Sequence, residues 1–172
     1  MHYEVARAIV YNDEVPIILP SHVYYSFYNS PYIAHKLGTA IDVYFDDYAL
    51  FPTFEGTVLE VKWFNAPKYR VDGLEREPLI VTRLNDEIIL KVLHVMPKVK
   101  LGDTLTLGDP IGKVIISGYL LPWSTPHAHF EVRNLKDPYR ARGAYKLRPI
   151  LNPQLYVPVS YTHLRAHETS LH

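Results

Sequence analysis

Hydrophobic and polar residues alternate with a period of two in several segments of this chain, which is typical of β-strands that bury one face. The pattern is clearest in residues 125–133, where apolar side chains are expected on one face and ionisable side chains on the other. The apolar set is Ala128, Phe130 and Val132, and the ionisable set is His127, His129 and Glu131. The ionisable groups would stand about 7 Å apart along a half-buried strand. The alternative is the exposed polar face of an edge strand.

Shorter stretches of the same kind predict further strands, separated by turns that contain Gly, Pro, Asn or Asp. The expected strands are residues 5–10, 15–19, 40–45, 55–63, 78–84 and 87–95, followed by very short strands within 101–114. Residues 20–34 are expected to be a loop, and residues 134–158 a wrapping extension. Fourteen Pro and fourteen Tyr, with many Val and Ile, favour strands and turns over helices. The sequence therefore predicts an all-β fold.

Composition limits the kind of protein. The 172 residues suffice for one domain with a substantial core, which we expect to span residues 1–158. Eighteen basic and eighteen acidic residues cancel, so the charge does not indicate binding to nucleic acid. Cysteine is absent, which excludes disulfides and thiolate metal sites. Any transition-metal site must therefore use His, Asp or Glu.

The sequence also bears on targeting. No apolar run approaches the roughly 18–20 residues that a membrane-spanning helix needs, so no membrane span is predicted. Residues 1–7 lack a basic stretch followed by an apolar one, so no signal peptide is visible. The cellular location is left open, and the oligomeric state is not predicted.

Two further residues are candidates for a site. Asp42 lies inside the apolar strand predicted over residues 40–45, where a carboxylate is costly unless it is paired, hydrogen-bonded or bound to a metal. A structural, hydrogen-bonded Asp is the alternative. His94 falls at the end of the strand predicted over residues 87–95, where a histidine is usually structural or exposed.

The order of motifs from His35 to Arg133 resembles that of the lysostaphin-type, or LytM-like, zinc metallopeptidases. The matching segments are His35…Gly38…Asp42, Gly56-Thr57-Val58, Val92-Leu93-His94-Val95, the Gly-Asp turn region of residues 99–112, and His127-Ala128-His129-Phe130-Glu131. The last two segments are specific when they occur together. The resemblance implies a compact antiparallel two-sheet β fold with a groove that holds the metal site.

The resemblance also implies a mechanism. Zn²⁺ would be bound by His35, Asp42 and His129, with water as the fourth ligand. His94 and His127 would flank that water or the developing oxyanion, as catalytic residues. A site with two His, one carboxylate and one open position is typical of catalytic zinc. Glu131 is a candidate partner for a ligating histidine.

The first motif departs from the family in its spacing. Six residues separate His35 from Asp42, whereas the family usually has three, so His22 remains an alternative ligand. Val92 also stands where the family usually has a Tyr. The substrate implied by the family is a peptide, often a cross-link peptide of the bacterial cell wall. Family members are usually exported.

Three functions are therefore considered. The first is a zinc metalloendopeptidase, and the second is a non-catalytic domain of the same fold that binds a peptide or a partner. A lipoyl- or biotinyl-like carrier ranks last, because no Lys lies in the required turn. Residues 159–172 resemble a translated sequencing-adapter sequence, and we expect them not to be native; His163 and His167 are therefore not considered as ligands.

Overall fold

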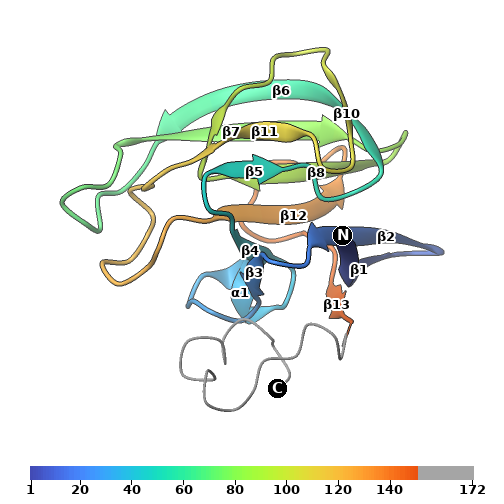
Figure 1. The fold of residues 1–172 in the computed structure, drawn as a ribbon, viewed down its shortest axis with the longest axis horizontal. Helices are drawn as coiled ribbons and strands as arrows, with labels where there is room; N and C mark the ends of the chain where they lie inside the picture. Colours follow the sequence, from blue (N-terminus) through green and yellow to red (C-terminus); the bar gives the residue numbers. More distant parts are fainter. Residues whose placement is uncertain (151–172) are drawn as a thin grey trace.

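The computed structural model describes residues 1–150, which form thirteen strands and one short helix (Figure 1). In chain order they are β1 (His2–Val10), β2 (Asp13–Pro20), β3 (Tyr24–Ser26), α1 (Ile33–Lys36), β4 (Ile41–Tyr44), β5 (Tyr48–Leu50), β6 (Glu55–Asn65), β7 (Arg76–Arg83), β8 (Ile88–Leu93), β9 (Val95–Pro97), β10 (Thr104–Thr106), β11 (Pro110–Val114), β12 (Ala128–Asn134) and β13 (Leu147–Pro149). All pairs of these strands run antiparallel, which confirms the predicted all-β fold class.

The strands are divided among three sheets, one more than the sequence led us to expect. The largest has seven strands in the order β10-β6-β7-β8-β12-β4-β3. A second has the order β13-β1-β2 and a third the order β5-β11-β9. The additional sheet arises because the N-terminal hairpin β1–β2 pairs with β13 instead of joining the large sheet. In Figure 1 this hairpin lies beside the end of β12.

Strand β12 lies inside the large sheet, between β8 and β4, and both of its faces are buried. The predicted alternation along this strand holds. Phe130 and Val132 belong to the main hydrophobic cluster, whereas His129 and Glu131 line a cavity on the other face. The edge-strand interpretation is therefore wrong, because paired strands cover both sides of β12 and its ionisable face is not exposed to solvent.

The main hydrophobic core joins all three sheets. Its buried residues include Ile17 of β2, Leu90 of β8 and Ile111 of β11, each fully buried. Burying such a side chain contributes roughly 1.5–3 kcal/mol. A smaller cluster of Leu79, Val81 and Ile89 lies apart from this core. The core thus holds one face of the large sheet rigidly and leaves the other face free to form a site.

Local differences from the expected elements have physical reasons. Residues 20–34 are not a loop throughout, because Tyr24–Ser26 pairs with β4 and Ile33–Lys36 forms one helical turn. Strand β8 ends at Leu93 rather than at Val95, because His94 adopts a φ of 67° that an extended strand does not allow. Within the predicted C-terminal extension, β13 pairs with β1.

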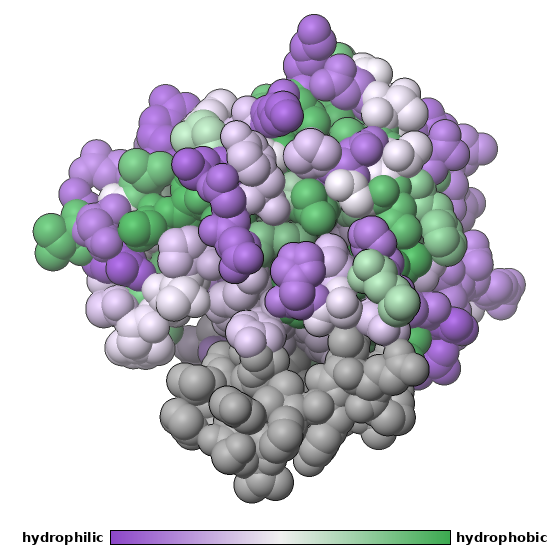
Figure 2. Space-filling model, viewed as in Figure 1, coloured by the Kyte–Doolittle hydropathy of each residue, from purple (hydrophilic) through white to green (hydrophobic). Residues whose placement is uncertain are grey.

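Figure 2 shows one side of the molecule, coloured by hydropathy. On the side shown in Figure 2, hydrophobic residues form small groups separated by hydrophilic ones. Within the described residues, no helix has the length and apolar character needed to cross a membrane. The proposed domain boundary at residue 158 and the tail of residues 159–172 lie outside the described part of the chain.

Candidate metal centre

Three elements bring a His–Asp–His group together on the cavity side of the large sheet. His35 comes from α1, Asp42 from β4 and His129 from β12, and all three side chains are buried. Their ligand-type atoms lie within 4.8 Å of one another. His129 and Asp42 are direct cross-strand partners, so the pairing of β12 with β4 fixes their approach. The three residues named from the sequence therefore form one cluster.

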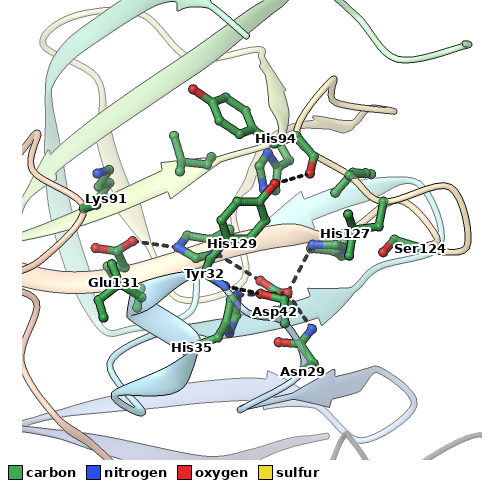
Figure 3. A pocket seen from close by; sticks show the side chains of 18 of the residues that line it. Asn29, Tyr32, His35, Asp42, Lys91, His94, Ser124, His127, His129 and Glu131 are labelled. Carbon is green, nitrogen blue, oxygen red and sulfur yellow. Dashed lines mark hydrogen bonds and ion pairs between the residues drawn. The ribbon is translucent and has the colours of Figure 1, made fainter. Parts of the chain in front are cut away.

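The carboxylate of Asp42 is the centre of this cluster (Figure 3). Its Oδ2 lies 3.2 Å from His35 Nε2, and its Oδ1 lies 3.1 Å from His129 Nδ1. His127 Nε2 also lies 3.2 Å from Oδ2, and Asn29 Nδ2 donates a hydrogen bond of 2.7 Å to the same oxygen. Four side chains thus converge on one buried carboxylate.

The unusual spacing between His35 and Asp42 is accommodated by a tight return of the chain after α1. Gly38 has a φ of 68°, a conformation that residues with a Cβ rarely adopt. Thr39 then bonds back to Ala34 O through both its backbone N–H, at 2.8 Å, and its hydroxyl, at 3.0 Å. This turn absorbs the extra residues, so the longer spacing still places His35 against Asp42.

His127 and His94 lie beside the cluster. His127 immediately precedes β12, and its Nδ1 lies 2.8 Å from Thr125 O. The ring centroid of His94 lies 5.4 Å from that of His127 and 5.8 Å from that of His129. The two histidines named as catalytic candidates therefore face the same space as the His–Asp–His group.

Two buried glutamates each hold one histidine. Glu131 Oε2 lies 2.7 Å from His129 Nε2, and Arg133 Nη1 donates a bond of 2.6 Å to Glu131 Oε1. Glu77 Oε1 accepts bonds from the backbone N–H of His94, at 2.6 Å, and from its Nδ1, at 2.7 Å. The hydroxyl of Ser117 donates to the other oxygen of Glu77. These contacts fix the orientation of both rings.

The charges around these groups shift their pKa values in different directions. Burial opposes the charge of His129, but its contacts with Asp42 and Glu131 outweigh burial and raise the pKa of His129 to about 9. Burial lowers the pKa of His94, and Glu77 only partly offsets this. Burial alone would raise the pKa of Asp42, yet His127 and His35 hold it well below its usual value. The pKa of Glu131 falls to about 2, because its contact with His129 outweighs burial.

A cavity of about 260 Å³ opens above the cluster. Its lining includes all five candidate site residues, namely His35, Asp42, His94, His127 and His129. Aromatic side chains from separate parts of the chain complete the wall, namely Tyr32, Phe64, Tyr119 and Tyr139. The residues that resemble a zinc site are therefore grouped where a ligand or substrate would have access.

The residues present fit a zinc ion. Two imidazoles and one carboxylate match the donor set of catalytic zinc sites. Among the described residues, two buried side-chain atoms lack a hydrogen bond, His35 Nδ1 and Asn29 Oδ1, and both belong to neighbours of Asp42. Such unpaired groups are uncommon in folded proteins. His129 faces Asp42 through Nδ1 while Glu131 holds its other nitrogen, an arrangement frequent in ligating histidines.

The alternative ligand His22 lies elsewhere. It is exposed, between β2 and β3, and is not among the residues that line the cavity. Sequence reasoning overlooked Asn29, Glu77 and Lys91. Lys91 occurs among apolar residues of a strand, the same signal that singled out Asp42. Glu77 instead follows the charged residues Glu75 and Arg76, and nothing in its local sequence distinguishes Asn29.

The fold and the cluster define an antiparallel β domain with a buried candidate metal centre. A family model described as "Domain of unknown function (DUF8155) N-terminal domain" matches residues 15–149, and the chain belongs to this family. No curated protein matches the chain. The matched family thus carries no activity in its description.

Several solved structures with some likeness to this chain are named as peptidases. A zinc containing peptidase from Vibrio cholerae is 24% identical, with a TM-score of 0.42, over 60% of this chain and 29% of that one. A mutant catalytic domain of the prophage-encoded M23 protein EnpA from Enterococcus faecalis is 22% identical, with a TM-score of 0.47, over 74% and 89%. The catalytic domain of the antimicrobial peptidase lysostaphin from Staphylococcus simulans is 18% identical, with a TM-score of 0.47, over 70% and 83%.

These likenesses concern the backbone at low identity, so the residue roles of those proteins are not transferred to this chain. This chain spans less than a third of the Vibrio cholerae peptidase, at 29% of its length.

Proposed function

We propose that this domain is a zinc-dependent endopeptidase. The observation that carries the proposal is the buried group of His35, Asp42 and His129 on the wall of a cavity that two further histidines share. A structural zinc site would be closed by four protein ligands, whereas this group offers three and faces a cavity. The motif resemblance supports the same activity.

The three ligand candidates would hold the ion, and the cavity would receive the peptide. Bound Zn²⁺ would polarise the scissile carbonyl and lower the pKa of a water molecule toward 7. Glu131 and Arg133 keep the ring of His129 in one orientation, because Glu131 Oε2 contacts its Nε2 and Arg133 holds the other oxygen of Glu131. Asn29 fixes the carboxylate of Asp42 in the same way.

His94 is the proposed general base. Its Nδ1–H donates to Glu77, which leaves Nε2 as the acceptor that takes a proton from the attacking water. Burial lowers the pKa of His94 and favours the neutral form that this step requires. The left-handed backbone of His94, with a φ of 67°, is a strained conformation of the kind often found at functional sites.

His127 is the proposed acid. Its Nδ1–H donates to Thr125 O, so its Nε2 is directed toward the cluster and the cavity. A proton held at this Nε2 stabilises the oxyanion and is then given to the departing amine. The proposed substrate is a peptide, with cell-wall-type cross-link peptides as the first class to test. This class rests on the motif resemblance.

Metal analysis and hydrolysis of the same sample test the proposal. We expect about one zinc per chain in the purified protein, and cleavage of glycine-rich or wall-type peptides that stops when a chelator removes the metal and returns when zinc is added. Full zinc occupancy without cleavage of any such peptide would contradict the endopeptidase and favour the non-catalytic binding domain. A protein that binds no zinc under these conditions would contradict both the metal centre and the mechanism.

A further inference from the structure

A second charged group lies in the cavity, and the mechanism above does not use it. Lys91 belongs to β8, lines the cavity and is only 5% exposed. Its cross-strand partners are Glu131 of β12 on one side and Val81 of β7 on the other. On the same face, the residues two positions before and after it are Ile89 and Leu93. The ammonium group thus stands beside Glu131, with apolar neighbours along its own strand and on β7.

The ammonium has few partners within the described residues. Its one hydrogen bond is to Tyr139 O, at 3.4 Å, which is long for a bond between an ammonium and a carbonyl. Glu131 forms no hydrogen bond with the ammonium group of Lys91, because one oxygen of Glu131 contacts His129 and the other accepts a bond from Arg133. No described carboxylate lies within 4.0 Å of Lys91 Nζ. Two of its three donors are therefore without an acceptor among residues 1–150.

Keeping an ammonium group at this position is unfavourable. Burial in this wall lowers the pKa of Lys91, and the charges of Glu131 and Asp137 only partly offset this. A buried charge with incomplete hydrogen bonding is less favourable than an apolar side chain of the same size. Met would fill the same volume at lower cost. A lysine at this position is explained if an anion completes its coordination when the cavity is filled.

We propose that Lys91 forms a carboxylate-binding subsite next to the metal centre, and that the preferred ligand is a peptide carrying a free carboxylate near the scissile bond. The inference rests on the proposed function in one respect, that the peptide lies in this cavity. A carboxylate is the anion that peptides offer, either as an acidic side chain or as the C-terminus. One ammonium and one carboxylate then neutralise each other through charge-assisted hydrogen bonds.

The strand register places this subsite relative to the reaction. His129 pairs with Leu93, and Glu131 pairs with Lys91, so Lys91 is the diagonal neighbour of His129. Diagonal neighbours in an antiparallel pair are roughly 7–8 Å apart, which corresponds to about two residues of an extended peptide. Figure 3 shows Lys91 on the Glu131 side of His129, away from His127. The carboxylate therefore belongs to the residue next to the scissile bond or to the one after it.

The first test uses the zinc-loaded protein and matched pairs of short peptides. One pair is acetyl-Gly-Gly with a free C-terminus against its C-terminal amide, and the other is acetyl-Gly-Glu-amide against acetyl-Gly-Gln-amide. NMR or calorimetric titration should give binding about tenfold tighter for the carboxylate member of one pair, and the pair that shows the preference identifies the source. Equal binding within both pairs would overturn the proposal.

Substitutions test whether Lys91 is responsible for the preference for carboxylate peptides. In Lys91→Met the carboxylate and amide members should bind equally, and Lys91→Arg should retain most of the preference. Lys62→Met is the matched control, because Lys62 is an exposed neighbour that stacks over the ring of Tyr139, and its loss should leave the preference unchanged. A preference that persists in Lys91→Met would assign the carboxylate to the metal ion or to another cation, and the proposal would fail.

A thermal melt of the free protein separates a binding role from a structural one. Lys91→Met should melt at the same temperature or a few degrees higher, since it removes a poorly partnered buried charge. A melting temperature lower by several degrees would show that Lys91 supports the fold, which contradicts the proposal. The two proposals can fail separately. If Lys91→Met loses the preference but the unmutated protein hydrolyses no peptide, the carboxylate subsite is supported and the endopeptidase activity is contradicted. If the unmutated protein hydrolyses peptides without preferring a carboxylate, the endopeptidase activity is supported and the subsite is contradicted.

Discussion

His129 and His94 are both buried, both face the same cavity and both contact a buried glutamate at 2.7 Å, yet their electrostatic surroundings differ. His129 lies between two carboxylates, Asp42 and Glu131, and its pKa is raised to about 9. His94 has only Glu77, and neighbouring histidines oppose its charge, so its pKa is lowered. The single glutamate beside His94 thus does not offset the lowering of its pKa by burial, whereas the two carboxylates beside His129 more than offset it.

This difference supports the different tasks that we propose for the two side chains. A region with an excess of carboxylate charge attracts a cation, so His129 and Asp42 suit a metal ion. A region where the imidazole stays neutral suits proton transfer, so His94 suits a base. The assignment depends on the charges around each ring and not on the histidine itself. Substitutions can disrupt the surroundings of His129 and those of His94 separately, and the largest effect is expected at Asp42.

Removing the charge of Asp42 should abolish zinc binding at the candidate metal centre. Asp42→Asn keeps the shape of the side chain but removes the carboxylate on which His35, His127 and His129 converge. We expect zinc affinity to fall by more than the roughly 10–100-fold that loss of an outer hydrogen-bond partner costs, because a direct ligand is lost. Zinc analysis after dialysis against a competing chelator measures this. Unchanged occupancy would mean that Asp42 is a structural residue.

Replacing each histidine in turn should distinguish the residues needed for zinc binding from those needed only for turnover. His129→Ala should lose zinc and hydrolysis together. His127→Ala and His94→Ala should retain zinc and lose about 10²–10⁴-fold in turnover, the range typical of a general acid or base. The measurement is zinc content alongside peptide cleavage for the three variants. Zinc loss in His127→Ala with retention in His129→Ala would exchange the roles of the two histidines.

The two glutamates offer a matched and milder comparison. Glu131→Gln should weaken zinc binding by about 10–100-fold, since it acts through His129. Glu77→Gln should leave zinc affinity unchanged and lower turnover, because a neutral amide favours the Nδ1–H tautomer of His94 less strongly than a carboxylate does. Zinc titrations and turnover under saturating zinc separate the two effects, and folding is checked by the melting temperature of each variant. If Glu77→Gln weakened zinc binding as much as Glu131→Gln, the two regions would not be independent.

Much of this arrangement could be predicted from the sequence, and the limits are instructive. The alternation of residues 125–133 predicted which side chains of β12 face the core, because the period of two is a local property. The burial of Glu77 could not be predicted in this way, since it depends on which strands pair with β7. The left-handed backbone of His94 also depends on a partner far along the chain, Glu77.

The smallest expected effect concerns His22, the alternative ligand that the long spacing before Asp42 left open. His22 is exposed and lies outside the cavity lining, whereas His35 is buried against Asp42 through the return of the chain at Gly38. His22→Ala should therefore leave zinc content and cleavage unchanged and alter stability by no more than about 0.5 kcal/mol, as exposed substitutions usually do. His35→Ala, measured beside it, should lose zinc. The reverse outcome, with zinc retained in His35→Ala and lost in His22→Ala, would show that the turn after α1 does not deliver the ligand. The metal centre would then have to form from a different arrangement of the N-terminal segment.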